Sequence, residues 1–408
     1  MEKLALYGGN PASPKLLGYG HQDISEDDIA AVVETLRSDY LTCGPATEAF
    51  EEALKQTTHA QFVTAVSNGT AALHIACLAA GVKPGDEVIV SPITFAASAN
   101  CVLYCGAKPV FADINPKTWN ISPDSIREKI TPKTKAIIAV DFGGVHVDSD
   151  AIRDICNEHN LIFIEDAAHS IGTIHNGCPI GSIADITTLS FHPVKTVTTG
   201  EGGAVTTNDP ELAKRILLFA KHGITRDTSL MQHPDEGPWY YEQLELGYNY
   251  RISDIEASLG VSQMKRLSEF TKRRQELVAF YNREFSKISE VSYQYDPTSE
   301  DTTRHLYVLR FDVDTLGKNR RFIFEALRAE NIGVNVHYLP VYRLPYYANL
   351  GYDPECCPEA NKYYNECITL PLHCCLSNED AQHVVDAVKK VINYCGVYAN
   401  QDCNGRIK

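Results

Sequence analysis

The chain has 408 residues, of which 44% are hydrophobic and 22% are charged, an ordinary composition for a globular protein with a sizeable core. Its formal net charge is −15, so a broad basic face that would bind nucleic acid is not expected. An acidic total does not exclude small anionic ligands, because backbone amides at a helix N-terminus bind phosphate whatever the total charge.

The targeting and cysteine patterns are typical of a soluble cytoplasmic protein. The N-terminus "MEKLALYGGNPASPKLL" lacks a long apolar segment, and no stretch reaches the ~18 apolar residues of a membrane helix. The 13 cysteines include no C-x-x-C pairs at zinc-finger spacing. The doublets Cys356-Cys357 and Cys374-Cys375 are poorly placed for tetrahedral ligation, so we expect reduced thiols and no metal.

The first 170 residues alternate between short apolar runs and helical patterns. Residues 25–39 open with a Ser-x-x-Asp cap, and residues 62–82 predict a strand, an Asn-Gly turn and a helix that stops at Gly81. The alternation continues with apolar, strand-like runs at 86–92, 108–114, 134–142 and 161–170, and with helical patterns at 95–106, 122–130 and 149–160. Continuous Val/Ile runs between helices indicate a mostly parallel sheet covered on both faces, with the site along the rim where the strands end.

The pattern changes near residue 250. A long amphipathic helical stretch at 253–288 precedes strand-like residues at 305–313, helix-like residues at 319–332 and the string "GVNVHY" at 333–338, and a helix is expected at 378–394. We therefore predict a large domain at 1–250, which includes the N-terminal segment. Linking helices and a smaller C-terminal α/β domain would occupy 251–408.

The stretch "SNGTAAL" (67–73) places Asn68, Gly69 and Thr70 where a strand turns into a helix. Free amides, a hydroxyl and the helix dipole at this position suit a phosphate. A plain tight turn with Thr70 as the cap explains the same residues, so this stretch alone leaves both interpretations open.

Asp166, in "FIEDAAHS" (163–170), lies at the end of an apolar strand. A carboxylate that stays ionised at this rim needs a cationic partner, such as a protonated ring nitrogen. Alternatively, Asp166 caps a following helix, which is a common role for aspartate. His169 follows on the same side and is placed to contact the same ligand, although a lone histidine is more often structural.

The stretch "LSFHPVKTVTTGEGGAVTT" (189–207) holds one lysine in an apolar, threonine-rich neighbourhood. Ser190 is suited to hold a phosphate, and His192-Pro193 makes a rigid turn ahead of Lys195. A desolvated lysine shifts toward the neutral amine, which forms a Schiff base with an aldehyde cofactor. A surface-loop lysine is the more frequent alternative. The order of phosphate turn, strand-end Asp166 and downstream Lys195 in one α/β domain favours the cofactor site.

This combination resembles the aspartate-aminotransferase fold, fold-type I of the enzymes that use pyridoxal 5′-phosphate. The strings "SNGTAAL", "SPITFAASAN", "EDAAHSIG", "SFHPVKTVTTGEGGAV" and "GYNYRISDIEASLG" together resemble the DegT-type nucleotide-sugar aminotransferases over nearly the whole chain. "GYNYR" is the most family-specific string, whereas "SNGTAAL" is shared more widely. "SFHPVK" and "VHYLPVY" most resemble the branch that aminates C4 of UDP-4-keto-6-deoxy-L-AltNAc in the pseudaminic-acid pathway.

The resemblance implies a role for each matching residue. Lys195 would be the Schiff-base lysine and general base, and Asp166 would be the partner of the pyridinium nitrogen. Phe95 would lie against the cofactor ring, and His169 would approach its phenolic oxygen, where many relatives carry Gln. The residues implied to hold the phosphate are Asn68, Gly69, Thr70, Ser190 and, from the other subunit, Asn249. The positions that match contacts to the nucleotide sugar are Tyr19, Asp39, Tyr40, Leu41, Thr42, Val336, His337, Tyr338 and Leu339.

By this resemblance, the chain is expected to be a homodimeric transaminase with shared active sites, pyridoxal 5′-phosphate as cofactor and L-glutamate as amino donor to C4 of a UDP-linked keto sugar. The alternatives within the family are another nucleotide-linked keto sugar, UDP- or dTDP-linked, or amination at C3. A sugar dehydratase of the same fold has histidine in place of Lys195. An α-keto-acid transaminase would use Arg251 as a carboxylate clamp. A non-catalytic regulator that binds the cofactor or the sugar is the alternative from another class.

Overall fold

The computed structural model describes residues 2–297 and 301–404. Its largest sheet has seven strands in the order β2-β10-β9-β6-β5-β3-β4. Their bounds are β2 (Phe62–Val66), β3 (Glu87–Val90), β4 (Lys108–Phe111), β5 (Thr134–Val140), β6 (Ile162–Asp166), β9 (Ile186–Ser190) and β10 (Gly203–Thr207). β10 is antiparallel to both of its neighbours, and the remaining neighbouring pairs are parallel. The prediction of a mostly parallel sheet is confirmed.

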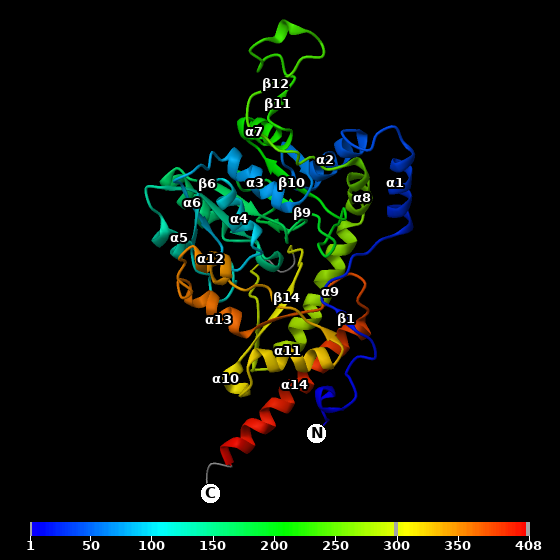
Figure 1. Cartoon of the computed structure of the whole chain (residues 1–408). Coiled ribbons are helices and arrows are strands. Elements are labelled where there is room, and N and C mark those ends of the chain that lie inside the picture. The colour runs from blue at the N-terminus through cyan, green and yellow to red at the C-terminus, as the bar shows by residue number, and fades with distance from the viewer. Residues whose placement is uncertain (1, 298–300, 405–408) are drawn as a thin grey trace.

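Helices cover both faces of this sheet (Figure 1). Alternate residues of β5 point to opposite faces, so Ile138 packs in the core under α3 and α4, whereas Ile137 packs in the core under α5 and α6. The helices of this layer are α2 (Pro45–Thr58), α3 (Gly69–Ala79), α4 (Ala97–Tyr104), α5 (Pro123–Lys129), α6 (Ser149–His159) and α7 (Pro210–Ala220). The sheet is therefore buried on both faces, and ligands have access at the strand ends.

The predicted cap of the first long helix is present. α1 (Glu26–Arg37) begins after Ser25, whose hydroxyl accepts the backbone N–H of Asp28, while the Asp28 carboxylate accepts the N–H of Ser25. This reciprocal capping box satisfies two of the N–H groups that every helix start leaves unpaired.

The helical stretch predicted at 253–288 consists of two helices, α8 (Asp254–Met264) and α9 (Leu267–Phe285). Arg266 leaves the helical conformation at φ −102° and ψ 4°. Its guanidinium pairs with Asp23 at 2.9 Å and with Asp28 at 2.7 Å. We attribute the break to these two ion pairs with the N-terminal segment. The spacing of apolar residues in this stretch does not predict such contacts.

The C-terminal part forms a second, smaller layer around an antiparallel three-stranded sheet of β13 (Val291–Tyr293), β14 (Tyr307–Phe311) and β16 (Cys367–Leu370). Its helices are α10 (Val313–Leu316), α11 (Arg320–Ala329), α12 (Pro345–Asn349), α13 (Pro358–Glu366) and α14 (Asn378–Asn404). β1 (Leu17–Gly18) pairs with β15 (Ile332–Gly333), so the N-terminal segment lies against this C-terminal part. The domain boundary at residue 250 stays a prediction.

A hairpin of β11 (Ile224–Thr225) and β12 (Glu242–Gln243) projects away from the rest of the chain at the top of Figure 1. A further short hairpin pairs β7 (Ile174–His175) with β8 (Cys178–Pro179). The four 3-10 turns are η1 (Ala5–Tyr7), η2 (Phe142–Gly144), η3 (Pro234–Glu236) and η4 (Val341–Arg343). Within the described residues, no helix combines the length and the hydropathy needed to cross a membrane.

Candidate active site

A cavity of about 950 Å³ opens at the carboxyl-terminal edge of the large sheet, where β5, β6 and β9 end and α3 begins. The predicted site residues that line it are Tyr19, Asn68, Gly69, Thr70, Phe95, Asp166, His169, Ser190, Lys195, Val336, His337 and Tyr338. These residues come from segments that are far apart in the sequence. The topology of the sheet brings them to one rim, as the crossover rule predicts.

The remaining predicted contacts, Asn249, Leu339 and the 39–42 segment (Asp39, Tyr40, Leu41 and Thr42), are not among the described residues that line this cavity. Thr42 forms a β-bridge with Ser253, and the backbone N–H of Asp254 donates to the carbonyl of Leu41. The segment therefore lies at the start of α8. Asn249 is exposed. The roles proposed for these residues stay predictions.

The N-terminus of α3 forms a cradle at one side of the cavity. Asn68 caps the helix, since its Oδ1 accepts the backbone N–H of Ala71 at 2.8 Å, so the alternative in which Thr70 is the cap is wrong. Ser190, at the end of β9, lies so close that a Cβ on Gly69 would be 2.9 Å from the Cβ of Ser190. Helix-start amides, a hydroxyl and a glycine that permits close approach together fit a phosphate group.

Asp166 is the last residue of β6 and is 4% exposed. Its Oδ2 accepts the hydroxyl of Ser98 at 2.7 Å, and its Oδ1 accepts the N–H of Ala168 at 3.2 Å. Burial raises the pKa of Asp166, whereas these hydrogen bonds and the charge of Lys195 lower it. No helix begins after β6, so Asp166 does not cap one. No ion pair forms with Asp166 in the described chain, and a protonated ring nitrogen would fit as its missing cation.

Lys195 lies in the turn between β9 and β10, and its backbone N–H donates to the carbonyl of His192 at 2.9 Å. Its side chain is partly buried and faces the cavity. Burial lowers the pKa of Lys195 to about 8, against the opposing pull of Asp166. About a tenth of this amine is therefore neutral at pH 7, far more than for an ordinary lysine, and the neutral amine is the form that attacks an aldehyde.

The opposite wall of the cavity is aromatic. The ring of Phe95 is 65% exposed at the mouth and lies 6.5 Å from the ring centroid of Tyr338. His169 is buried, and its Nδ1 accepts the backbone N–H of Gly143 at 3.2 Å. Burial, followed by the charges of Lys195 and His337, lowers the pKa of His169 well below its usual value. A flat ligand ring would find an exposed aromatic face and a neutral imidazole here.

Two functional neighbours escaped the sequence analysis. Ser98, which binds Asp166, stands in the quoted string "SPITFAASAN", three residues after Phe95, and its hydroxyl is also 2.7 Å from that of Thr94. A hydroxyl residue three positions after Phe95, at the start of a predicted helix, is the sequence feature that could have identified Ser98. His305 lies before β14 with its ring centroid 4.5 Å from that of His169. Nothing local marks His305, because its position depends on how the two parts of the chain pack.

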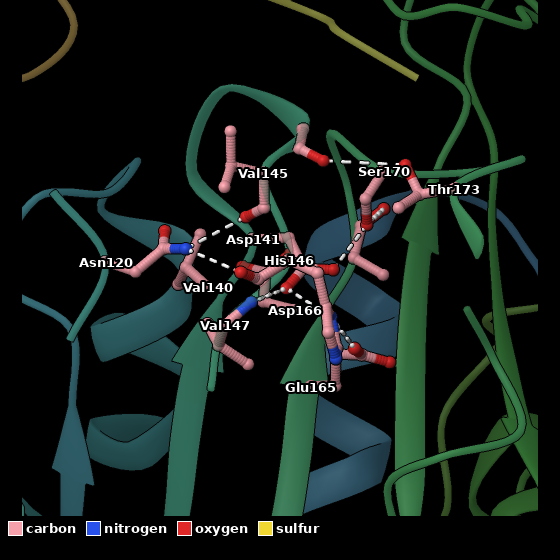
Figure 2. A network of polar contacts seen from close by, with 12 residues as sticks. Asn120, Val140, Asp141, Val145, His146, Val147, Glu165, Asp166, Ser170 and Thr173 are labelled. Atoms are coloured by element: carbon pink, nitrogen blue, oxygen red, sulfur yellow. Dashed lines mark hydrogen bonds and ion pairs between the residues drawn. The ribbon is translucent and has the colours of Figure 1, made fainter. Parts of the chain in front are cut away.

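A buried polar cluster lies behind Asp166 (Figure 2). Neighbouring residues of a strand point to opposite faces, so Glu165 turns away from the cavity toward His146 and Asp141. His146 Nδ1 lies 3.1 Å from both Asp141 Oδ1 and Glu165 Oε1. Burial alone would lower the pKa of His146, but the two carboxylates raise it to about 10. A buried imidazolium between carboxylates thus holds β5 and β6 together at the strand end that presents Asp166.

The cavity carries little positive charge. Among the described residues that line it, Lys195 is the one lysine or arginine. Burial lowers the pKa of His337 to about 4, and the pKa of His305 also falls well below its usual value for the same reason. These imidazoles are neutral donors and acceptors, so further cations for an anionic substrate must come from outside this cavity.

The sequence model of the DegT/DnrJ/EryC1/StrS aminotransferase family matches residues 22–389. The spore coat polysaccharide biosynthesis protein SpsC of Bacillus subtilis is 39% identical over 92% of this chain and 97% of its own length. The UDP-4-amino-4,6-dideoxy-N-acetyl-beta-L-altrosamine transaminase of Campylobacter jejuni is 35% identical over 93% of this chain and 100% of its own.

Among solved structures, the putative sugar aminotransferase Spr1654 of Streptococcus pneumoniae in its PMP-form superposes with a TM-score of 0.86 at 32% identity. The match covers 94% of this chain and 100% of that one. A PLP-form of the same protein gives a TM-score of 0.85. The similarity therefore extends over both the large sheet and the C-terminal part, in sequence as well as in fold.

Proposed function

Because the chain belongs to the DegT/DnrJ/EryC1/StrS aminotransferase family and is a pyridoxal 5′-phosphate-dependent sugar aminotransferase, we propose that it transfers the amino group of L-glutamate to C4 of a UDP-linked 4-keto-6-deoxy-N-acetylhexosamine. The observation that carries this proposal is one cavity in which a lysine with a lowered pKa, a buried aspartate that forms no ion pair with the described residues, and a helix N-terminus meet. The Campylobacter relative, whose name specifies an altrosamine sugar, supports the choice of substrate.

This geometry supports the following residue roles. Bound pyridoxal phosphate supplies an electron sink for the electron pair that remains when a proton leaves the carbon next to the amino group. The neutral amine of Lys195 attaches the cofactor and, once released, moves that proton as general base. Asp166 keeps the ring nitrogen protonated. The cofactor phosphate is assigned to Asn68, Gly69, Thr70 and Ser190, and Phe95 covers the ring.

The substrate sugar is assigned to a second set of cavity residues. Tyr19, Val336, His337 and Tyr338 line the cavity, and their hydroxyl, imidazole and backbone groups suit sugar hydroxyls. Leu339 and the 39–42 segment lie farther out and are proposed to contact the nucleotide. The net charge of −15 gives no long-range attraction for a dianionic substrate. Neutral hydrogen-bond donors at short range are therefore proposed to bind it.

We propose a homodimer with shared sites. Asn249 is not among the described residues that line its own chain's cavity, forms a β-bridge with Lys221 just after α7, and is assigned to the phosphate of the second subunit. The segment 224–249, which contains the β11–β12 hairpin, exposes large apolar side chains, with Trp239 75% and Leu246 78% exposed. Exposed apolar side chains of this kind are typical of a surface that contacts another protein chain. The predicted cytoplasmic location belongs to the same proposal.

Product analysis tests the substrate assignment. The enzyme is loaded with pyridoxamine phosphate and incubated with UDP-4-keto-6-deoxy-L-AltNAc, its D-gluco-configured epimer, and dTDP-linked 3-keto and 4-keto sugars. NMR of the products is expected to place a new amine at C4 of the UDP-linked sugar. Preferred amination of a dTDP sugar, or an amine at C3, would overturn the substrate assignment and leave the aminotransferase class intact.

A further inference from the structure

The loop of residues 141–147 follows β5 and contacts His169 through the backbone N–H of Gly143. Polar contacts hold this loop from several sides (Figure 2). Asp141 accepts the N–H of Val147 at 3.0 Å through Oδ1 and the hydroxyl of Ser170 at 2.6 Å through Oδ2. The amide of Asn120 donates to the carbonyls of Val145 and His146, each at 3.0 Å. Asp141 and Ser170 are fully buried, so water does not compete for these bonds.

The tip of this loop has no room to rearrange. Gly143 and Gly144 have φ values of 67° and 99°, a region that favours glycine. A Cβ on Gly143 would lie 2.8 Å from Oε1 of Gln294, and one on Gly144 would overlap the carbonyl of Thr303. The backbone N–H of Gly143 is thereby aimed in one direction, toward Nδ1 of His169 at 3.2 Å.

That contact determines where the imidazole proton is. A backbone amide can only donate, so Nδ1 of His169 must be the unprotonated acceptor nitrogen. His169 is 6% exposed and neutral, so its one N–H proton is on Nε2. His169 lines the cavity, and its Nε2 lies 3.5 Å from the hydroxyl of Tyr338, which lines the same cavity.

We propose that the 141–147 loop, with Asp141 as its positioning residue, fixes His169 in the Nε2–H tautomer and makes it a hydrogen-bond donor to an oxygen bound in the cavity. Only the identity of that oxygen, the phenolic oxygen of the cofactor, rests on the proposed function. A donor at this place stabilises the ionised form of the oxygen, which an acceptor nitrogen would destabilise. An amide side chain offers the same N–H, so glutamine is the conservative replacement.

The tautomer can be measured without cofactor or turnover. Cofactor-free enzyme is labelled with [15N]histidine, and the two signals of His169 are identified as those missing from His169→Gln. At every pH at which the protein is folded, we expect Nδ1 to show the chemical shift of an unprotonated nitrogen and Nε2 that of a protonated one. A protonated Nδ1, or an averaged pair of shifts, overturns the proposal, whichever reaction the enzyme catalyses.

Two sets of variants test the consequences. In Asp141→Asn one of the two acceptor oxygens becomes an NH2 donor, so the loop loses one of the bonds to Val147 and Ser170, and the two His169 shifts are expected to move toward each other. In holoenzyme, His169→Gln is expected to keep turnover within a few-fold of wild type, whereas His169→Leu loses about tenfold or more. The absorbance titration of the bound cofactor should shift to higher pH in His169→Leu and stay near wild type in His169→Gln. Equal loss in both His169 variants would contradict the donor role.

Discussion

Ser98 donates its hydroxyl to Oδ2 of Asp166 over 2.7 Å, and this bond joins the start of α4 to the end of β6. It is the shortest hydrogen bond that the structure gives to the Asp166 carboxylate. Because a hydroxyl donor stabilises the ionised carboxylate, Ser98 offsets part of the burial that raises the pKa of Asp166. Ser98 therefore favours the ionised state of Asp166 that the proposed role of this residue requires.

Replacing Ser98 tests this relationship. In Ser98→Ala the pKa of Asp166 rises further, so the acid limb of the kcat profile is expected to move to higher pH and kcat to fall about tenfold. Ser182→Ala is the matched control, since the hydroxyl of Ser182 donates to the carbonyl of Pro179 at 2.9 Å, and neither residue lines the cavity. An unchanged pH profile in Ser98→Ala would show that Asp166 does not depend on this bond.

The rate at which cofactor-free enzyme binds pyridoxal phosphate covalently should depend on pH through Lys195. The neutral amine is the reactive form, and burial lowers the pKa of Lys195 to about 8 from an ordinary 10.5. The rate is expected to rise up to about pH 8 and then level off. Stopped-flow absorbance measures it, with a free lysine derivative as the reference. A rate that keeps rising as steeply as the reference does above pH 8 would contradict a lowered pKa.

His146 should contribute stability that depends on pH. Its pKa is raised to about 10 from an ordinary 6.5, so its contribution is full below pH 6.5 and is lost as the pH rises to about 10. His146→Gln leaves two buried carboxylates without their cation and is expected to lower the free energy of unfolding by about 3 kcal/mol. Urea unfolding at several pH values measures the difference.

The control is His159→Gln, at the end of α6, which should change stability by less than about 0.5 kcal/mol. For His146→Gln the loss should shrink steadily between pH 6.5 and pH 10. A loss of the same size at every pH would mean that His146 acts through packing alone.

Shared sites predict complementation between inactive chains. Lys195→Ala and Asn249→Ala each disable one contribution to a site, and a two-fold dimer of the two variants collects both lesions in one site and leaves the other intact. Mixing the inactive homodimers is expected to restore up to about a quarter of wild-type activity, since random exchange makes half the dimers mixed, each with one intact site. Proven subunit exchange with no recovery, or a fully active monomer, would contradict the shared site.

The sequence predicts most of the large sheet and the core of the site, for a physical reason. Apolar runs between helical patterns specify parallel strands, and parallel strands place their carboxyl ends on one edge. Asn68 and Asp166 directly follow or end such strands, so their meeting at the rim follows from local patterns. The position of Lys195 is harder to predict from local patterns, because the turn that holds it leads into the antiparallel strand β10.

What the sequence does not predict depends on contacts between distant segments. The helix break at Arg266 is caused by Asp23 and Asp28, more than 230 residues earlier. His305 reaches His169 only because the C-terminal part packs on the 141–147 loop, where its backbone N–H donates to the carbonyl of Gly143. Neither contact leaves a periodicity or a motif near the residue concerned.

Covalent trapping shows whether Lys195 is the residue that bonds to the cofactor. Holoenzyme is reduced with borohydride, digested and analysed by peptide mass spectrometry, and turnover of Lys195→Ala is measured beside it. We expect the reduced pyridoxyl group on the peptide that contains Lys195, and a Lys195→Ala variant that still binds the cofactor but does not turn over. A pyridoxyl group on another lysine, or near-wild-type turnover by Lys195→Ala, would contradict the account.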